Sequence, residues 1–312
     1  MDNSITKRSE SKEMSQKPAV PEAFFNSVTE SLNFANLGVL GLPWDISSSF
    51  RRGAAEGPTY IRHATSGQLY NSFTETGRNI KETWQIFDMG DAPITNIDAM
   101  EAKSIVTNTI RKHNRHGLRF FFMGGDHLST YFTFTALKKI QNLRMGLIYL
   151  DAHPDLYDHY EGNPYSHACV VKRIIDETNI EPESIIQVGI RSPTPEQVDY
   201  ANSVGIKTIT TKDIAQSGPQ AAAETVKSFI PSYLDGVYLS IDLDVLDPAY
   251  APGVGNPEPA GLTTRELIEF LHGLQGIKIH SFDIVELCPK FDPSGISALA
   301  AAKLIKEILG IF

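Results

Sequence analysis

The most informative stretch of the chain is MGLIYLDAHPD, residues 145–155. Its first six residues, Met145–Leu150, form a short apolar block, which is typical of a strand buried on both faces of a sheet. Asp151, His153 and Asp155 follow at every second position, so in extended backbone their side chains share one face. A buried strand that ends in converging polar groups indicates an α/β sheet with a ligand site at its carboxyl edge.

Apolar blocks and helical patterns alternate over most of the chain from Leu37 onward. The predicted strands are Leu37–Leu42, Gln85–Met89, Arg119–Met123, Met145–Leu150, Ser184–Ile190, Lys207–Ile209, Gly236–Ile241 and Lys278–Val285. The predicted helices are Ala99–His113, Leu128–Lys139, Ala221–Phe229, Thr264–Leu274 and Ser297–Ile308. This alternation predicts a three-layer α/β/α sandwich with a mostly parallel central sheet. Residues 1–20 are polar and aperiodic, so we expect a disordered tail there and a single domain over residues 21–312.

Charge and composition exclude several classes of function. The 312 residues carry a formal net charge of -9, and an acidic chain without a basic run suits neither nucleic acid nor an anionic membrane. The two cysteines, Cys169 and Cys288, are too far apart in sequence for a CxxC site. No apolar run approaches the ~20 residues of a membrane span, and residues 1–18 lack the apolar segment of a signal peptide. We therefore expect a cytoplasmic protein that binds neither nucleic acid nor membrane.

Two further polar clusters also follow predicted strands. Gly124-Gly125-Asp126-His127 follows one of them, and its glycines permit a sharp turn before a His at the start of a helix. Asp242 and Asp244 follow another and again alternate onto one face. Neighbouring carboxylates at a buried strand end repel each other unless a cation neutralises them.

Together the three clusters supply two imidazoles and four carboxylates. These are His127, Asp151, His153, Asp155, Asp242 and Asp244. The set exceeds the three or four protein ligands of a typical Zn²⁺ site. It fits two metals about 3.5–4 Å apart, which lower the pKa of a bound water and so provide a nucleophile near neutral pH. A plain βα turn capped by Asp126, and a polar loop after Leu150, are the alternatives for the first two clusters.

The three clusters, GGDH, DAHPD and SIDLDVLDP, resemble in order and approximate spacing the signature motifs of the ureohydrolases, the family of arginase and agmatinase. The resemblance runs from about Leu37 to the C-terminus. It implies a parallel α/β/α sandwich, a homo-oligomer (a trimer or hexamer) and two Mn²⁺ ions per subunit. The implied ligands of one ion are His127, Asp151, Asp155 and Asp242. Those of the other ion are Asp151, His153, Asp242 and Asp244.

The same resemblance implies roles for residues outside the metal centre. The family's acid/base histidine matches His167 in YSHA, and the carboxylate that receives the guanidinium group matches Glu286 in FDIVEL. Glu286 would orient the guanidinium, and Asp155 or His167 would carry a proton to the leaving amine. Tyr157 and Asn256 are the further predicted substrate contacts.

Within the ureohydrolases the sequence looks most like agmatinase, which implies hydrolysis of agmatine to putrescine and urea. Tyr157 stands where arginases place an Asn that holds the substrate α-carboxylate. Asp158 and Glu161 would repel such a carboxylate, whereas aromatic rings attract an ammonium group. Alternatively, this loop is exposed to solvent and selects nothing. Other substrates in the family are arginine, guanidinobutyrate and other guanidino acids, guanidine and formiminoglutamate; a single-zinc deacetylase and a non-catalytic metal-binding protein are the more distant alternatives.

Overall fold

The computed structural model describes residues 23–312, so the predicted tail, residues 1–20, lies outside the described residues. Its centre is an eight-stranded sheet in the order β2-β1-β3-β8-β7-β4-β5-β6, with every neighbouring pair parallel. The strands are β1 (Leu37–Gly41), β2 (Ile86–Asp91), β3 (Arg119–Met123), β4 (Met145–Leu150), β5 (Ile185–Ile190), β6 (Lys207–Thr210), β7 (Gly236–Asp242) and β8 (Ile279–Val285). Each predicted strand is confirmed, and its ends differ from the prediction by no more than about two residues, as is usual for such boundaries.

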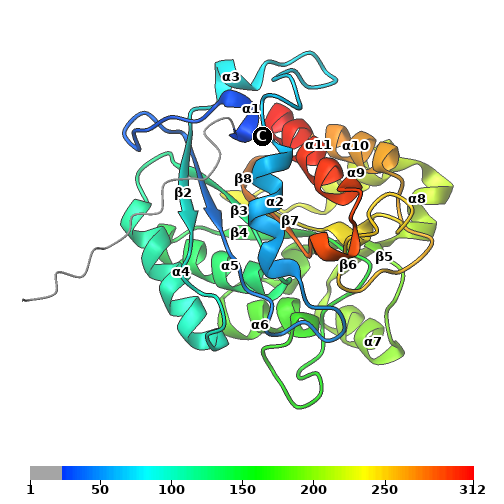
Figure 1. Cartoon of the computed structure of the whole chain (residues 1–312). Helices are drawn as coiled ribbons and strands as arrows, with labels where there is room; N and C mark the ends of the chain where they lie inside the picture. Colours follow the sequence, from blue (N-terminus) through cyan, green and yellow to red (C-terminus); the bar gives the residue numbers. More distant parts are fainter. Residues whose placement is uncertain (1–22) are drawn as a thin grey trace, which may run out of the picture.

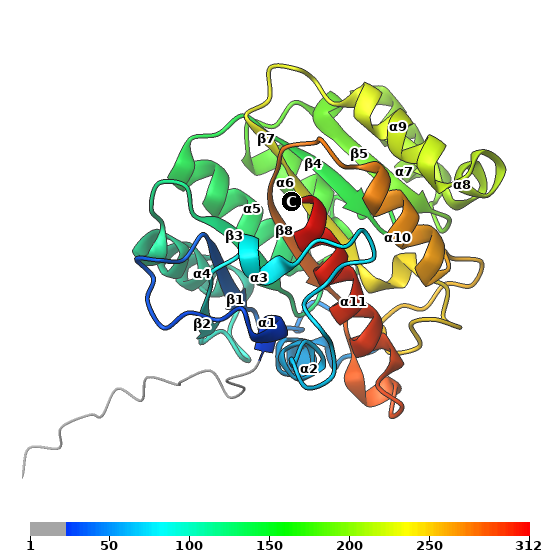
Figure 2. The ribbon, with the colours of Figure 1, turned by 90° about the horizontal axis from the view of Figure 1, so that it is seen from above.

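Helices cover both faces of the sheet (Figures 1 and 2). One face is covered by α4 (Ala99–His113), α5 (Leu128–Gln141), α6 (Val170–Glu177) and α7 (Pro195–Val204). The other is covered by α1 (Ala23–Asn26), α2 (Gly57–Ala64), α3 (Ile80–Thr83), α8 (Thr211–Ser217), α9 (Pro219–Phe229), α10 (Thr264–Gly273) and α11 (Ile296–Ile311). The three-layer α/β/α prediction is therefore confirmed. In the described part of the chain, no helix combines the length and apolar character needed to cross a membrane.

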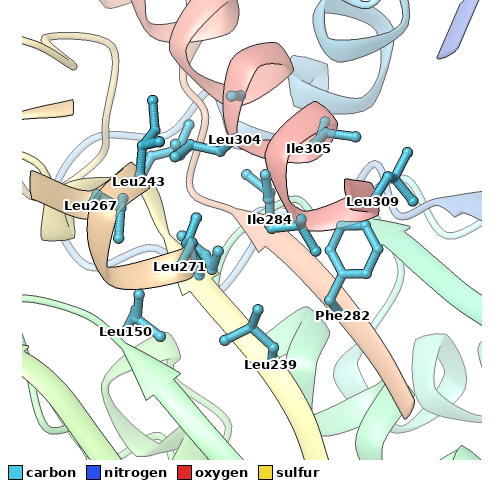
Figure 3. Close-up of a cluster of buried hydrophobic side chains, with 14 of the residues drawn as sticks. Leu150, Leu239, Leu243, Leu267, Leu271, Phe282, Ile284, Leu304, Ile305 and Leu309 are labelled. Atoms are coloured by element: carbon cyan, nitrogen blue, oxygen red, sulfur yellow. The ribbon is translucent and has the colours of Figure 1, made fainter. Parts of the chain in front are cut away.

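Two apolar cores lie on opposite faces of the sheet because successive strand residues point to opposite sides. In β7, Leu239 belongs to the core under α10 and α11, where Leu271 also packs (Figure 3). Its neighbour Tyr238 faces the other way and meets Phe134 of α5 with ring centroids 5.7 Å apart. All four side chains are fully buried. Burying each such side chain contributes about 1.5–3 kcal/mol, which holds both helical layers against the sheet.

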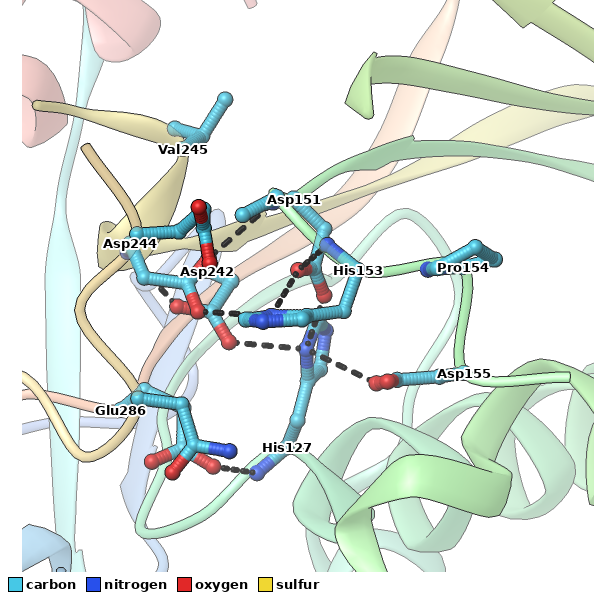
Figure 4. Close-up of polar contacts among 12 residues, drawn as sticks. His127, Asp151, His153, Pro154, Asp155, Asp242, Asp244, Val245 and Glu286 are labelled. Atoms are coloured by element: carbon cyan, nitrogen blue, oxygen red, sulfur yellow. Dashed lines mark hydrogen bonds and ion pairs between the residues drawn. The ribbon is translucent and has the colours of Figure 1, made fainter. Parts of the chain in front are cut away.

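The strand order places the three sequence clusters together. β3, β8, β7 and β4 are consecutive neighbours in the middle of the sheet. Because all four run in the same direction, the residues that follow them meet at one edge. Figure 4 shows that His127, Asp151, His153, Asp155, Asp242, Asp244 and Glu286 thus come together, although they are far apart in the sequence.

Candidate metal centre

The aspartates that end β4 and β7 each use one side-chain oxygen to accept a backbone N–H. Asp151 Oδ1 accepts from His153 N at 2.6 Å, and Asp242 Oδ1 accepts from Asp244 N at 2.7 Å. Asp244 Oδ1 accepts from Ala152 N at 3.1 Å. The two-residue spacing of D-x-H and D-x-D closes the first two of these turns. In each carboxylate the second oxygen, Oδ2, is left for the neighbouring imidazoles (Figure 4).

Those second oxygens and two imidazole nitrogens form two adjoining groups. His127 Nδ1 lies 2.9 Å from Asp151 Oδ2 and 3.1 Å from Asp242 Oδ2. His153 Nδ1 lies 3.0 Å from Asp244 Oδ2 and 3.4 Å from Asp151 Oδ1. In each group the potential ligand atoms lie within 4.8 Å of one another, and Asp151 belongs to both. The structure thus brings five of the six predicted ligands into two candidate metal sites, although Asp242, which was implied for both ions, lies in the first group only.

Asp155 lies beside these two groups. Its Oδ2 is 3.6 Å from His127 Nδ1 and accepts the Tyr149 hydroxyl at 2.6 Å. The Tyr149 ring stacks on the His127 imidazole, with centroids 4.4 Å apart and planes 7° apart. The backbone of Asp155 has a φ of 50°. A non-glycine residue in that region costs on the order of 1–3 kcal/mol, and such strain concentrates at functional sites.

The charges of the centre are consistent with bound cations. Asp151 Oδ2 is buried and accepts no hydrogen bond from the described residues, although His127 Nδ1 is 2.9 Å away. The two atoms lie close together without the geometry of a hydrogen bond, as two ligands of one ion do. Burial, reinforced by Asp244, raises the pKa of Asp242, and burial together with Asp151 raises the pKa of Asp155 to about 7. Hard divalent cations would neutralise these carboxylates, so the residues present fit a metal centre.

Buried polar side chains orient the His127 ring on the side away from the candidate metal centre. Its Nε2 lies 2.9 Å from Ser240 Oγ, which donates to Asp283 Oδ1 at 2.8 Å. Thr130 and Tyr238 donate to the other oxygen of Asp283, at 2.8 and 2.6 Å. With its Nε2–H given to Ser240, His127 presents the lone pair of Nδ1 to the centre. Sequence analysis missed these supports, although a charged residue inside the apolar block of β8 is a usable signal.

The segment between β3 and α5 is shaped by close packing. A Cβ at Gly125 would lie 1.7 Å from the carbonyl oxygen of Trp44. The glycine is therefore required for the approach of two backbones, and neither it nor its neighbour has a positive φ. Asp126 accepts from Leu128 N at 3.2 Å and from the backbone N–H of Ser47 at 3.1 Å. Asp126 thus accepts the first backbone N–H of α5 from one residue before the N-cap, His127, close to the capping role that one alternative gave it, and it also anchors the loop that follows β1.

Glu286 and His167 are in contact at the bottom of the same site. Glu286 is 2% exposed, has a φ of 63°, and accepts on Oε1 from the backbone N–H of His127 at 2.9 Å. The same oxygen lies 2.8 Å from His167 Nδ1. Its Oε2 is buried and has no partner among residues 23–312. Burial lowers the pKa of His167, but Glu286 and Asp126 outweigh it and raise the pKa to about 9. Cations bound to the nearby carboxylates would oppose that rise.

A cavity of about 280 Å³ opens onto these groups. Beyond the candidate centre, Glu286 and His167, its wall includes Ser49, Tyr157, Tyr160, Ser192, Thr194, Gln197 and Asn256. The predicted contacts Tyr157 and Asn256 are thus placed in the cavity. The prediction that Asp158 and Glu161 act on the substrate was wrong, because neither lines the cavity and Asp158 is paired with Arg173 at 2.8 Å. Tyr160, one of the aromatic residues expected to attract an ammonium group, does line the cavity, whereas Ser49 was missed, since no motif marks it.

Comparison with known proteins agrees with this architecture. A parallel α/β sandwich with a His–Asp cluster at its carboxyl edge is the arrangement of an α/β metallohydrolase. The model of the Arginase family matches residues 35–310, and the chain belongs to that family. As a member it is a hydrolase that acts on guanidino C–N bonds.

Similar proteins carry several specific names. The chain is 33% identical over 277 residues to the guanidinopropionase of Pseudomonas aeruginosa, covering 88% of this chain and 85% of the relative. It is 34% identical over 281 residues to the mitochondrial arginase 1 of Arabidopsis thaliana, covering 88% and 80%. The solved structure of the agmatine ureohydrolase of Thermoplasma volcanium matches with a TM-score of 0.80 at 30% identity, covering 92% of this chain and 93% of that one.

Proposed function

We propose that this chain is a binuclear manganese hydrolase that cleaves agmatine to putrescine and urea. The observation that carries the proposal is a pair of His–Asp groups sharing Asp151, beside the unpaired buried Oε2 of Glu286. The two groups suit divalent cations. The free carboxylate oxygen suits the planar guanidinium cation, which is rich in N–H donors. The relatives are named for different guanidino substrates, so likeness alone does not choose among them.

The two ions would be held by the six predicted ligands. The first group is His127, Asp151 and Asp242, with Asp155 beside it, and the second is Asp151, His153 and Asp244. Two bound Mn²⁺ ions would supply Lewis acidity and lower the pKa of a water molecule. Manganese is the metal that the family resemblance implies, and oxygen and imidazole ligands suit it.

Other side chains would bind the substrate and move protons. Glu286 Oε2 would accept a guanidinium N–H, and its position is fixed because Oε1 is held by the His127 backbone and by His167. His167, which is 6% exposed and lines the cavity, would carry a proton to the leaving amine. Asp155, whose pKa burial and Asp151 raise to about 7, is a second group able to take part in that transfer.

The composition of the cavity wall favours agmatine over arginine. Tyr157 stands where arginases place the Asn that holds the α-carboxylate, and among the described residues that line the cavity there is no lysine or arginine to replace it. An α-carboxylate would therefore lose its water without gaining that partner. Agmatine carries an ammonium group in place of the amino acid end. Tyr157 and Tyr160, with ring centroids 5.5 Å apart, offer aromatic surface that attracts such a group.

Urea release from agmatine, arginine, 4-guanidinobutyrate and guanidine by the manganese-loaded protein tests the proposal. We expect about two Mn²⁺ per subunit and the highest kcat/KM for agmatine. Glu286→Gln is a matched variant, because it keeps the shape and removes the charge; it should raise KM and retain manganese. Arginine equal to or better than agmatine would exclude the proposed substrate, and no urea from any compound would exclude the proposed activity.

We further propose that the chain folds as one domain and forms a homo-oligomer, a trimer or hexamer, in the cytoplasm, as the family resemblance implies. Cys169 and Cys288 are both buried and free, which suits a reducing compartment. Sedimentation equilibrium would give the mass of the assembly. A mass equal to one chain would contradict the proposed oligomer.

A further inference from the structure

A series of hydrogen bonds links the loop after β1 to the bottom of the cavity. The backbone N–H of Ser49 donates to His167 Nε2 at 3.0 Å, and Ser49 Oγ lies 2.8 Å from the same nitrogen. Because a backbone N–H can only donate, Nε2 must accept. In the neutral ring, the form that cations bound to the nearby carboxylates favour, the proton of His167 is therefore on Nδ1, from which it is donated to Glu286 Oε1 at 2.8 Å.

The same constraint orients the amide of Asn256. Since His167 Nε2 accepts, the Ser49 hydroxyl donates to it and keeps its own lone pairs free. These accept from Asn256 Nδ2 at 3.4 Å. The amide thus turns its nitrogen toward Ser49 and its oxygen away from it.

Two acceptor oxygens are left without donors by this arrangement. Asn256 Oδ1 and Glu286 Oε2 are both buried, and neither has a hydrogen-bond partner in the described chain. Both side chains line the same cavity. Gly255, the residue before Asn256, packs against Glu286, because a Cβ there would lie 2.8 Å from Glu286 Oε2. Buried acceptors without partners are rare in folded proteins, so a pair in one cavity indicates a ligand that donates to both.

We propose that Asn256 is a second recognition residue for guanidinium and that Ser49 is the positioning residue that sets its amide. The inference rests on the proposed function. A guanidinium has N–H groups on three nitrogens in one plane, so it can donate hydrogen bonds to Asn256 Oδ1 and Glu286 Oε2 at the same time. An alkylammonium donates from a single nitrogen. The paired acceptors therefore select the guanidinium end of a substrate that is cationic at both ends.

Binding of two simple cations separates this role from general attraction to a negative cavity. Guanidinium chloride and methylammonium chloride would each be titrated into the manganese-loaded protein, and the rise in Tm would give the Kd. Asn256→Leu removes the acceptor at similar volume, and its guanidinium Kd should rise about tenfold, as expected for one hydrogen bond to a charged group. The methylammonium Kd should change less than about twofold. Asn256→Asp is the matched control, because it keeps an acceptor and should bind guanidinium at least as well as the wild type.

Ser49 gives an independent test. Ser49→Ala leaves the backbone N–H on His167 but frees the Asn256 amide, so the guanidinium Kd should rise. Ser49→Thr restores the hydroxyl and should restore the Kd. An unchanged guanidinium Kd in Asn256→Leu would overturn the inference even if the wild type releases urea from agmatine. Equal rises in both Kd values, or a loss of manganese, would show a structural role and would also overturn it. If no guanidino compound yields urea, the proposed function fails, while the two Kd values still decide the role of Asn256.

Discussion

Tyr149→Phe would test how the candidate metal centre is supported from inside the sheet. The phenol hydroxyl donates to Asp155 Oδ2 at 2.6 Å and lies 3.0 Å from His127 Nδ1. The ring itself stacks on the His127 imidazole with centroids 4.4 Å apart. Tyr149 is fully buried, so the substitution removes one oxygen atom and keeps the packing of the ring.

The expected size of the effect follows from the lost hydrogen bond. A hydrogen bond to a charged group contributes about 1.5–3 kcal/mol, and about 1.4 kcal/mol is a factor of ten in an equilibrium constant. The ion beside His127 and Asp155 should therefore bind about 10- to 100-fold more weakly, which is also the usual effect of removing a support of a metal ligand. The ion between His153 and Asp244 should change less, because Tyr149 makes no hydrogen bond to either residue in the described chain.

Competition with a chelator, followed by metal analysis of the protein, would measure this difference. At intermediate chelator concentration the variant should retain about one ion where the wild type retains two. Tyr131→Phe is a matched control, because that buried tyrosine donates to a carboxylate away from the centre, Glu177, at 2.5 Å. Equal affinity of wild type and Tyr149→Phe for both ions would refute the reasoning that Tyr149 acts through Asp155.

Three further predictions test other parts of the molecule. Asp242→Ala should lose metal and activity, because Asp242 faces one imidazole and holds the backbone of Asp244; a fully active variant would contradict the site. His167→Ala should lower turnover with manganese content nearly intact, and loss of manganese would instead make His167 a ligand. Burial, with Arg119 next, lowers the pKa of His280 to about 4. Between about pH 6.5 and 4 His280 is therefore protonated in the unfolded chain but not in the folded chain. The free energy of unfolding consequently falls as the pH falls through this range. His280→Gln should flatten that slope in urea unfolding, and an unchanged slope would contradict the cause.

The sequence predicted the strands well because each is a compact apolar block. Arg119–Met123 and Met145–Leu150 have the predicted bounds, since charged or turn-forming residues stand at their ends. The helices α2, α6, α7 and α8 were not predicted. They have only 8, 8, 10 and 7 residues, and of these α6 has a clear apolar face, Val170, Val171 and Ile174, that could have revealed it.

The sequence predicted the position of those site residues that directly follow a strand, but not of those in longer loops. His127, Asp151 and Asp242 follow parallel strands, so their meeting at one edge follows from a general rule of such sheets. The loop after Asp155 has no such rule. Asp158 turns toward Arg173, a contact between segments that no local pattern announces, and this is why its predicted effect on the substrate was wrong. Ser49 reaches the cavity for an equally non-local reason.

The polar row beneath the ligands explains how four strands can hold one centre in place. Tyr149, Ser240 and Asp283 are register partners across β4, β7 and β8. The first two precede the aspartates at the ends of their strands by two residues, so support and ligand share a face. An apolar row would pack equally well against α5, but it would leave His127 Nε2 without an acceptor and the ring free to turn Nδ1 away from the centre. The buried Asp283 therefore orients one candidate metal ligand, His127, through Ser240.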